Sequence, residues 1–292
     1  YTVEFVKSTS SMALVSLRRC LGAVLKNGAA MVQTRSYSAA SGYLKVTTEN
    51  DIATIAMDKK PVNSLNLEFL TELSLTLEKL ENEKCKGLIL TSALPKIFSA
   101  GLDILEMYQP KEERLRQFWS TLQDVWLRLY GSPLVTIAAI SGHSPAGGCL
   151  LSLSCDYRIM ADNYTIGLNE TKLGIVAPFW FVDTMHNVVG HRQTEMALQL
   201  GTMFSSQEAL SIGLVDRVVG EGETVDAAKK EMSQWVKIPG YARQLSKMQL
   251  RKPTIDKLVA RKEDDINYFA TFITKDGVQK AMGMYLESLK KK

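Results

Sequence analysis

Two short glycine-containing loops place small residues where a strand gives way to a helix, an arrangement that can expose main-chain N–H groups. The loops are Phe98–Ile104 (FSAGLDI) and Ser144–Leu150 (SPAGGCL), and each follows an apolar run with the composition of a buried strand. The first N–H groups of a helix have no partner inside it, so two such loops at one sheet edge can direct two donors at a single oxygen. Donors placed in this way stabilise the negative charge that develops on a reacting carbonyl oxygen. Either loop alone is a weak signal, because glycine at a helix start commonly serves packing or a turn.

The surrounding segments alternate between strand and helix patterns, which indicates how the loops are positioned. Strand-type runs at 43–48 and 52–57 are joined by a turn, and an amphipathic helix with leucines at three- and four-residue spacing follows the candidate cap Asn66. A second amphipathic helix is expected at 112–130, before the apolar run at 134–140. Alternation of this kind predicts a mainly parallel sheet with helical crossover connections.

Beyond about residue 180 the sequence is typical of helices, apart from a short apolar segment at 213–219. The last part of the chain carries apolar residues at helical spacings, which predicts two or three amphipathic helices. Their apolar faces must be covered by the core or by another subunit. We therefore divide the chain into a leader at 1–42, a core at 43–235 and a helical C-terminal segment at 236–292.

Composition excludes several classes of protein. The chain has 292 residues, of which 46% are hydrophobic and 23% charged, as is ordinary for a globular protein. No apolar run reaches the roughly 18 residues that a membrane span needs. Residues 1–37 hold five basic residues and one acidic residue, so they account for the whole net charge of +4 and give no charge argument for nucleic-acid binding by the rest. The four cysteines and three histidines show no metal-binding pattern, so no metal is expected.

The N-terminal segment has the composition of a mitochondrial transit peptide. From Met12 to Thr48 there is no aspartate or glutamate, while arginine, serine and small apolar residues alternate. The stretch TRSYSAA resembles a matrix-protease site with cleavage after Tyr37, and residues 1–11 precede the candidate initiator Met12. We expect a disordered leader and a location in the mitochondrial matrix, with an ordinary disordered tail as the alternative.

Four motifs, taken in order along the chain, resemble those of the crotonase (enoyl-CoA hydratase/isomerase) superfamily. They are PVNSLN at 61–66, FSAGLDI at 98–104, PAGGCLLSLSCDYRIMAD at 145–162 and GLNETKLGI at 167–175. The resemblance covers about residues 44–290 and implies an α/β fold: a crotonase-like ββα spiral with a helical C-terminal segment used in trimer formation. It also implies a homotrimer and an acyl-CoA thioester substrate, with no cofactor beyond the coenzyme A that the substrate carries.

The resemblance assigns roles to residues of both loops. The main-chain N–H groups of Leu102 and Gly147 would form the oxyanion hole. Asn169 would contact the thioester or orient a neighbouring carboxylate, although a turn-forming asparagine is the alternative. The remaining residues expected along the thioester and nucleotide path are Ala100, Gly101, Asp103 and Ile104.

Glu170 is the expected proton-transfer group, and Leu150 decides between reactions. In the hydratases that the chain resembles, glutamates at both positions hold and activate a water, whereas this chain has only Glu170. Leucine cannot accept a proton, so hydration loses one of its two acid/base groups. One carboxylate can still remove a proton from one carbon and return it to another. An apolar setting would raise its pKa and suit it to this role. The residues expected to supply that setting are Leu150, Leu168, Ile175, Phe179 and Trp180.

We therefore expect an isomerase of fatty-acid β-oxidation that moves the double bond of a cis or trans 3-enoyl-CoA to give 2-trans-enoyl-CoA. Glu170 would carry a proton from C2 to C4 while the two N–H groups hold the thioester enolate. Phe179 and Trp180 would narrow and dry the pocket, unless they are ordinary core aromatics. The alternatives are another crotonase activity, such as an enoyl-CoA hydratase or an acyl-CoA thioester hydrolase, and a non-catalytic CoA- or RNA-binding scaffold.

Overall fold

The structure is a computed structural model that describes residues 34–38 and 42–290, with side chains from Gly42 to Leu289. Its strands form a seven-stranded sheet in the order β1-β2-β3-β4-β6-β8-β11 and a four-stranded sheet in the order β10-β9-β7-β5. The strands are β1 (Thr34–Ser38), β2 (Leu44–Glu49), β3 (Ile52–Met57), β4 (Gly87–Ser92), β5 (Lys96–Ile97), β6 (Val135–Ile140), β7 (Gly142–Pro145), β8 (Tyr157–Ala161), β9 (Thr165–Gly167), β10 (Phe204–Ser205) and β11 (Arg217–Val219).

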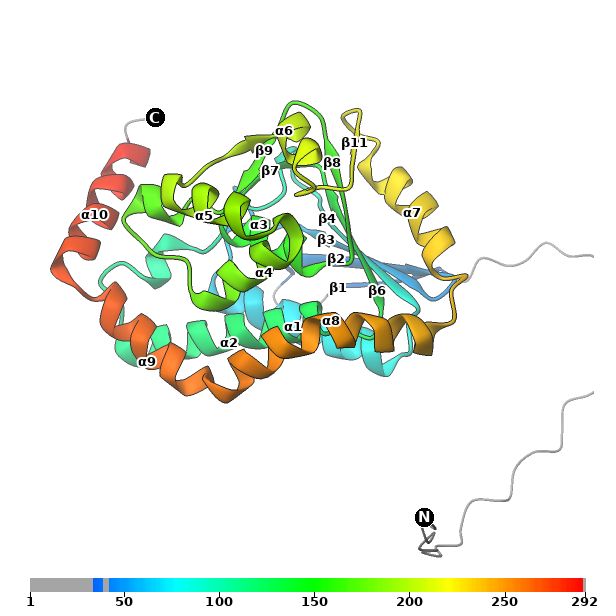
Figure 1. The fold of residues 1–292 in the computed structure, drawn as a ribbon, viewed down its shortest axis with the longest axis horizontal. Helices are drawn as coiled ribbons and strands as arrows, with labels where there is room; N and C mark the ends of the chain where they lie inside the picture. The colour runs from blue at the N-terminus through cyan, green and yellow to red at the C-terminus, as the bar shows by residue number, and fades with distance from the viewer. Residues whose placement is uncertain (1–33, 39–41, 291–292) are drawn as a thin grey trace, which may run out of the picture. The chain divides into compact units, whose positions relative to one another are not determined.

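Helices connect these strands and then continue alone to the C-terminus (Figure 1). The α-helices are α1 (Leu67–Asn82), α2 (Glu112–Tyr130), α3 (Gly147–Ser154), α4 (Phe179–Val189), α5 (His191–Leu200), α6 (Ser206–Ser211), α7 (Thr224–Trp235), α8 (Gly240–Ala260), α9 (Lys262–Ile273) and α10 (Asp276–Lys290). There are also two short 3-10 helices: η1 (Ile104–Glu106) begins at the end of the first glycine-containing loop, and η2 (Glu170–Leu173) begins at Glu170.

The two sheets arise from a repeated unit that gives one strand to each sheet. In the pairs β4/β5, β6/β7 and β8/β9, the first strand joins the larger sheet and the second joins the smaller one. The pairings along β3-β4-β6-β8-β11 are parallel, and so are those along β9-β7-β5, whereas β2 pairs antiparallel with β1 and β3. The mainly parallel sheet predicted from the alternation of strands and helices is therefore confirmed.

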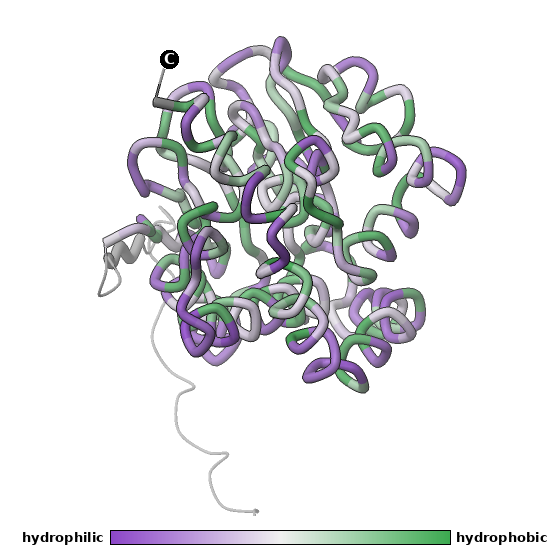
Figure 2. Tube along the Cα trace, turned by 90° about the vertical axis from the view of Figure 1, so that its left-hand side faces the viewer, coloured by the Kyte–Doolittle hydropathy of each residue, from purple (hydrophilic) through white to green (hydrophobic). Residues whose placement is uncertain are grey.

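Both predicted amphipathic helices form as the residue spacing indicates. The Asn66 side chain accepts a hydrogen bond from the Phe69 N–H at 3.1 Å, which caps α1 as expected. The leucine stripe of α1 is buried, and α2 covers the predicted range of 112–130. Figure 2 shows hydrophobic and hydrophilic residues alternating along the outer helices, as expected of helices that turn one face to the core.

The larger sheet is covered on both faces. Helix α7 packs on β4, β6 and β8, where a small apolar cluster includes Ile137, Ile159 and Met232. The alternate residues of the same strands, such as Leu90 and Ala138, belong to the main core with α1, α2 and α3. Strands buried on both faces account for the continuous apolar runs in the sequence.

Strand β1 lies inside the segment expected to be a disordered leader. It pairs antiparallel with β2, and Tyr37 stands opposite Val46. The expectation of disorder therefore does not hold for Thr34–Ser38, because their main-chain groups pair with the edge of the sheet. The rest of the predicted leader, including Met12, lies outside the described residues.

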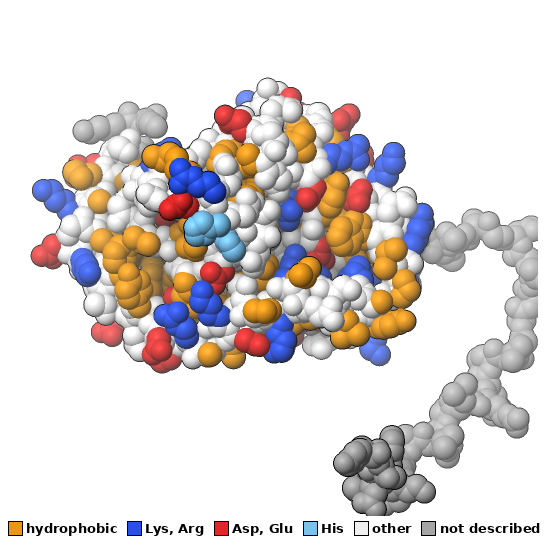
Figure 3. Space-filling view, viewed as in Figure 1, with side chains coloured by type: hydrophobic (Ala, Val, Ile, Leu, Met, Phe, Trp, Pro, Cys, Tyr) orange, Lys and Arg blue, Asp and Glu red, His pale blue; other side chains and the backbone are white. Residues whose placement is uncertain are grey.

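Figure 3 shows acidic and basic side chains interspersed over the visible face, with hydrophobic side chains grouped both on the side where α10 lies in Figure 1 and on the side where α7 and α8 lie. None of the helices in residues 42–290 combines the length and the apolar character needed to cross a membrane.

Candidate functional site

The two glycine-containing loops and the Glu170 segment leave the same edge of the smaller sheet. Strands β5, β7 and β9 are parallel neighbours, and their register places Ile97 beside His143 and Pro145 beside Gly167. The residues that follow each strand must therefore meet at the carboxyl ends of the strands, where α/β sheets bind ligands. The main chain fixes this meeting further, because the Ala146 N–H donates to the Gly167 carbonyl at 2.8 Å.

A cavity of about 630 Å³ lies at this meeting point. Six of the eight predicted site residues line it: Ala100, Leu102, Asp103, Ile104, Asn169 and Glu170. The other two, Gly101 and Gly147, stand next in the chain to the lining residues Ala100, Leu102 and Ala146. The structure therefore brings the whole predicted set together.

The two predicted oxyanion donors are adjacent. A Cβ atom on Gly101 would lie 2.9 Å from the Gly147 amide nitrogen, and one on Gly147 would lie 3.2 Å from the Leu102 amide nitrogen. Within the described chain, neither the Leu102 nor the Gly147 N–H donates a hydrogen bond. Gly147 is the first residue of α3, so its N–H has no acceptor in that helix. Two free, neighbouring N–H groups are the geometry that an oxyanion requires.

A short strand-like pairing with the segment before α1 fixes the main-chain conformation of the first loop. Leu65 and Leu102 form an isolated parallel bridge, in which the Leu65 N–H donates to the Gly101 carbonyl and the Asp103 N–H donates to the Leu65 carbonyl. Main-chain groups of an extended segment alternate in direction, so the Leu102 N–H faces away from this pairing. That orientation leaves it available to a ligand.

Asn63, in the PVNSLN motif, anchors the same loop from below. Its buried side-chain amide donates to the Phe98 carbonyl at 3.0 Å and to the Ser92 hydroxyl at 2.8 Å, and the Ser99 hydroxyl donates to the Asn63 carbonyl at 2.7 Å. Sequence reasoning used this motif only for its resemblance. The structure shows that the hydrogen bonds of Asn63 connect β4 to the first loop.

Ala146 has a strained main-chain conformation, which sets the direction of the Gly147 N–H group. Its φ of 48° and ψ of −120° lie in a region that side-chain-bearing residues rarely adopt. Both of its main-chain groups are bonded, the N–H to Gly167 and the carbonyl to the Leu150 N–H. The strain is therefore imposed by the smaller sheet on one side and by α3 on the other, and it turns the chain so that Gly147 begins the helix at the cavity.

Glu170 is a buried carboxyl group without a polar partner among the described residues. The residue is 8% exposed, and neither of its side-chain oxygens has a hydrogen-bond partner. Burial raises the pKa of Glu170 from 4.5 to about 7, and the polarity of its own main-chain N–H opposes this rise. The nearby Cys149 thiol, in the first turn of α3, has its pKa raised by burial and then by the negative charge of Glu170. A carboxyl group that exchanges its proton near neutral pH suits general acid/base catalysis.

The pKa of Glu170 predicts a pH-dependent stability. The unfolded chain releases this proton near pH 4.5 and the folded chain near pH 7, so the folded state binds more protons between these values. The free energy of unfolding therefore falls as the pH rises through that window, by about 3 kcal/mol at about 1.4 kcal/mol per pH unit. Relative to wild type, Glu170→Gln should gain stability by about this amount between about pH 4 and pH 8 in denaturant titrations.

The exposed Glu113 supplies the matched control for this measurement. Glu113→Gln makes the same chemical change on the surface, so it serves as the control in the same denaturant titrations. An equal pH dependence in both variants would show that burial of Glu170 does not perturb its ionisation.

Asn169 and Asp103 differ in their surroundings. The Asn169 side-chain oxygen is buried without a hydrogen-bond partner, as expected of a group that faces a ligand. Asp103 instead caps η1, accepts a hydrogen bond from Ser64 at 2.9 Å and pairs with Lys59 at 3.3 Å. It therefore braces the first loop as well as lining the cavity.

The expected role of two aromatic residues at the start of α4 is wrong. Neither Phe179 nor Trp180 lines the cavity, which Pro178 and Phe181 reach instead. The Phe179 ring lies under the charges of Lys257 and Arg261, and Trp180 is fully buried. The sequence does not show which residues of the first helical turn face the cavity. The orientations of these adjacent aromatic residues therefore could not be predicted.

Apart from Ile175, the apolar walls of the cavity come from residues that sequence reasoning did not assign to the site. They are supplied by α2, α9 and α10 and by the loop after Glu170. The cavity residues concerned are Trp119, Leu173, Ile175, Val176, Phe269, Tyr285, Leu286 and Leu289. The apolar stripes of the C-terminal helices were the available signal, but a stripe does not say which surface it covers.

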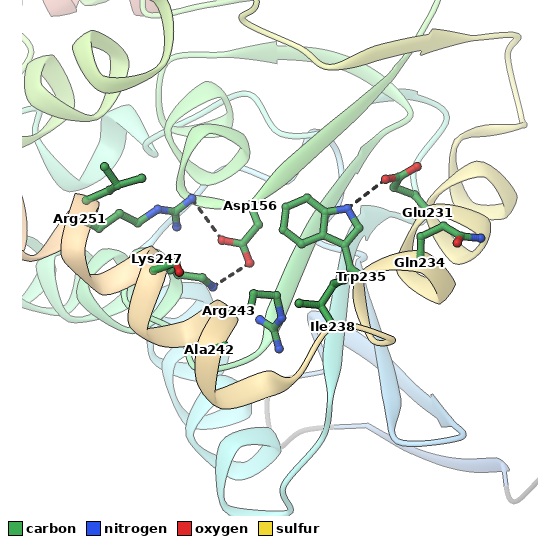
Figure 4. A pocket seen from close by; sticks show the side chains of 11 residues that line it. Asp156, Glu231, Gln234, Trp235, Ile238, Ala242, Arg243, Lys247 and Arg251 are labelled. Carbon is green, nitrogen blue, oxygen red and sulfur yellow. Dashed lines mark hydrogen bonds and ion pairs between the residues drawn. The ribbon is translucent and has the colours of Figure 1, made fainter.

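A second cavity, of about 660 Å³, lies between α7 and α8 (Figure 4). One of its two carboxylates, Asp156, lies between two basic side chains of α8: Lys247 at 2.7 Å and Arg251 at 3.2 Å. Both basic groups also donate to main-chain carbonyls, including Ser132 and Cys155. These contacts dock α8 on the ends of α2 and α3, so we assign this cluster a structural role.

No group of three or more His, Cys, Asp or Glu side chains in the described residues is placed to hold a metal ion. Two carboxyl groups line the cavity, but Asp103 is bonded to Ser64 and Lys59, so Glu170 is the one without a polar partner. With two main-chain donors and an apolar wall, this carboxyl group can move a proton while an enolate is stabilised, and there is no second acid/base group at Leu150, which is buried within α3.

Comparison with known proteins identifies the family. Residues 47–292 match the family model described as enoyl-CoA hydratase/isomerase, and the chain belongs to this family. Over 287 residues it is 50% identical to the mitochondrial enoyl-CoA delta isomerase 1 of Mus musculus, covering 96% of this chain and 99% of the relative. The Homo sapiens protein of the same name is 51% identical over 256 residues, which are 85% of each chain.

A solved structure agrees with the sequence relatives. The crystal structure of human mitochondrial delta3-delta2-enoyl-CoA isomerase is 49% identical and covers 88% of this chain and 98% of its own, with a TM-score of 0.82. The predicted crotonase-like α/β fold is therefore confirmed.

Proposed function

We propose that this protein is an enoyl-CoA isomerase that moves the double bond of a 3-enoyl-CoA to give 2-trans-enoyl-CoA. The observation that carries the proposal is the presence of a single buried carboxyl group, Glu170, in one cavity with Leu102 and the residue before Gly147. The isomerase names of relatives at about half identity over nearly the whole chain support the same reaction. The double bond changes place within one molecule, so the reaction needs no cofactor beyond the coenzyme A of the substrate.

The proposed reaction moves one proton twice. The Glu170 carboxylate removes a proton from C2, and the electron pair of that bond passes into a dienolate whose negative charge lies mainly on the thioester oxygen. The Leu102 and Gly147 N–H groups hold that oxygen, each worth about 2.7–4 kcal/mol in the transition state. The protonated Glu170 then delivers the proton to C4, and the double bond ends between C2 and C3. The enzyme returns to its starting protonation state.

The apolar surroundings of Glu170 favour this sequence over water addition. Residue 150 is a buried leucine, so the site has no second carboxylate at this position to orient a water. A buried acid with no polar partner also keeps its proton for return to the substrate in place of losing it to solvent.

The proposal is tested by comparing two reactions of the wild-type protein. A 3-enoyl-CoA should be converted to the conjugated 2-trans product, followed by its ultraviolet absorbance. Hydration of 2-trans-enoyl-CoA should be slower by about 10² or more, because it lacks one acid/base group. Comparable rates of hydration would favour the hydratase alternative, and binding of acyl-CoA without turnover would favour the scaffold.

We also propose that the protein acts as a homotrimer in the mitochondrial matrix. Exposed apolar side chains on α8, among them Tyr241, Leu245 and Leu250, support a subunit interface at the C-terminal segment. The composition of the leader and the mitochondrial names of the relatives support the location. The mass of the protein in solution tests the homotrimer. Import of the full chain into isolated mitochondria tests the location.

A further inference from the structure

The inner end of the catalytic cavity is closed by three aromatic rings. Trp119 is 2% exposed, Phe181 1% and Phe269 5%, whereas the rim residues Leu105 and Val176 are 69% and 53% exposed. An acyl chain that enters past the rim therefore ends its path against these rings. They come from α2, α4 and α9, so their positions depend on how these three helices are joined.

A single buried carboxylate joins them. Asp265 of α9 is 6% exposed, and one of its oxygens, Oδ2, accepts three hydrogen bonds. The donors are Trp119 Nε1 at 2.8 Å, Gln123 Nε2 at 2.8 Å and Trp180 Nε1 at 3.1 Å. Two of them belong to α2 and one to α4. Hydrogen bonds to an ionised acceptor are stronger than neutral ones, and a buried network of this kind fixes its members in one arrangement.

The rings that Asp265 holds are in direct contact with one another. Trp119 stacks on Phe269 with ring centroids 3.4 Å apart and planes 8° apart. Trp180 meets Trp119 edge-on at 5.9 Å and Phe181 at 4.5 Å. Trp180 does not line the cavity itself, but its contacts with Trp119 and Phe181 support the rings that do. An indole that can neither slide nor turn gives the cavity a fixed depth.

We propose that Asp265 is a positioning residue that limits the length of the acyl chain. It holds the Trp119 indole against Phe269, and the rings then close the acyl end of the cavity. The proposal rests on the proposed isomerase function for its substrate, but the fixed depth applies to any acyl-CoA bound in this cavity. Asp265 lies behind the wall and touches no substrate.

The test compares Asp265→Asn with Asp264→Asn. Both substitutions replace a carboxylate of α9 by an amide of the same shape, but Asp264 is exposed and makes none of these bonds. Affinities for saturated acyl-CoA thioesters of increasing length, which cannot react, are measured by calorimetry. Rates with 3-enoyl-CoA substrates of the same lengths are measured alongside.

Asp265→Asn leaves only a neutral amide oxygen as the acceptor, which weakens the three hydrogen bonds and loosens the Trp119 ring. It should therefore raise the ratio of long-chain to short-chain affinity and kcat/KM by about tenfold, the scale on which apolar pockets distinguish chain length. Asp264→Asn should keep the wild-type ratio. An equal fall at every length would mean that Asp265 is merely structural and would overturn the proposal, as would an unchanged profile.

Trp119→Phe provides a second route if Asp265→Asn does not fold. It keeps an aromatic ring but removes the hydrogen bond to Asp265, so it should change the length profile in the same direction. A wild-type protein that binds acyl-CoA with a sharp length limit but does not isomerise would refute the proposed function alone. A wild-type protein without any length limit would refute the role of Asp265.

Discussion

Replacing Glu170 by glutamine is expected to lower isomerase kcat by about 10²–10⁴-fold, the contribution typical of a positioned acid/base group. Glutamine has nearly the same shape, so the buried site should stay filled, but the amide can neither accept the C2 proton nor return one to C4. Single-turnover assays with a 3-enoyl-CoA measure the chemical step directly. The affinity for acyl-CoA should change little, because the carboxyl group of Glu170 makes no hydrogen bond in the unliganded site.

The combination of results makes this prediction specific. A catalytic group that is costly to bury should, when replaced, give a protein that is less active and more stable at neutral pH. Full activity in Glu170→Gln would remove Glu170 from the mechanism. Loss of both binding and activity would instead indicate a collapsed cavity.

Gly101→Ala is expected to lower kcat by at least about 10²-fold, as the loss of one oxyanion donor does. Gly101 has a φ of +88°, and an added Cβ would lie 2.9 Å from both the Ala146 Cβ and the Gly147 amide nitrogen. Neither atom belongs to a flexible side chain that could swing aside. The two loops must therefore separate, which moves the Leu102 and Gly147 N–H groups apart.

Gly222 offers a control with the same main-chain strain. Its φ is +85°, and within the described structure an added Cβ would meet no atom within 4 Å. Gly222→Ala should therefore lose about 1–3 kcal/mol of stability from its main chain while keeping wild-type kcat. If both alanine variants retain full kcat, the close approach of the loops does not matter for catalysis.

Much of the fold follows from local patterns in the sequence. The leucine spacing of α1, its Asn66 cap and the full range of α2 are confirmed, because each depends on residues a few positions apart. The meeting of the two loops and Glu170 could also be predicted, since parallel strands bring the residues after them to one edge. The roles of these residues in catalysis stay predictions until the substitutions are made.

The remainder of the site depends on contacts between distant segments. Asp265 lies 146 positions from Trp119, and nothing in the spacing of either helix pairs them. The strained conformation of Ala146 could not be predicted from the sequence either, because it is imposed by hydrogen bonds to β9 and α3 and not by its own residue type. Strand β1 was assigned to a leader because its composition resembles one, whereas pairing with β2 depends on main-chain groups that composition does not describe.

The proposed oxyanion donors are main-chain atoms, which has a consequence for how this enzyme can change over generations. A side-chain replacement at Leu102 leaves its N–H in place, and only proline would delete it. Mutational drift at that position can reshape the wall without erasing the polarising groups, whereas one codon change at Glu170 removes the proton carrier. New reactions on this scaffold would therefore arise first through the gain and loss of carboxylates, with the anion-stabilising backbone inherited intact.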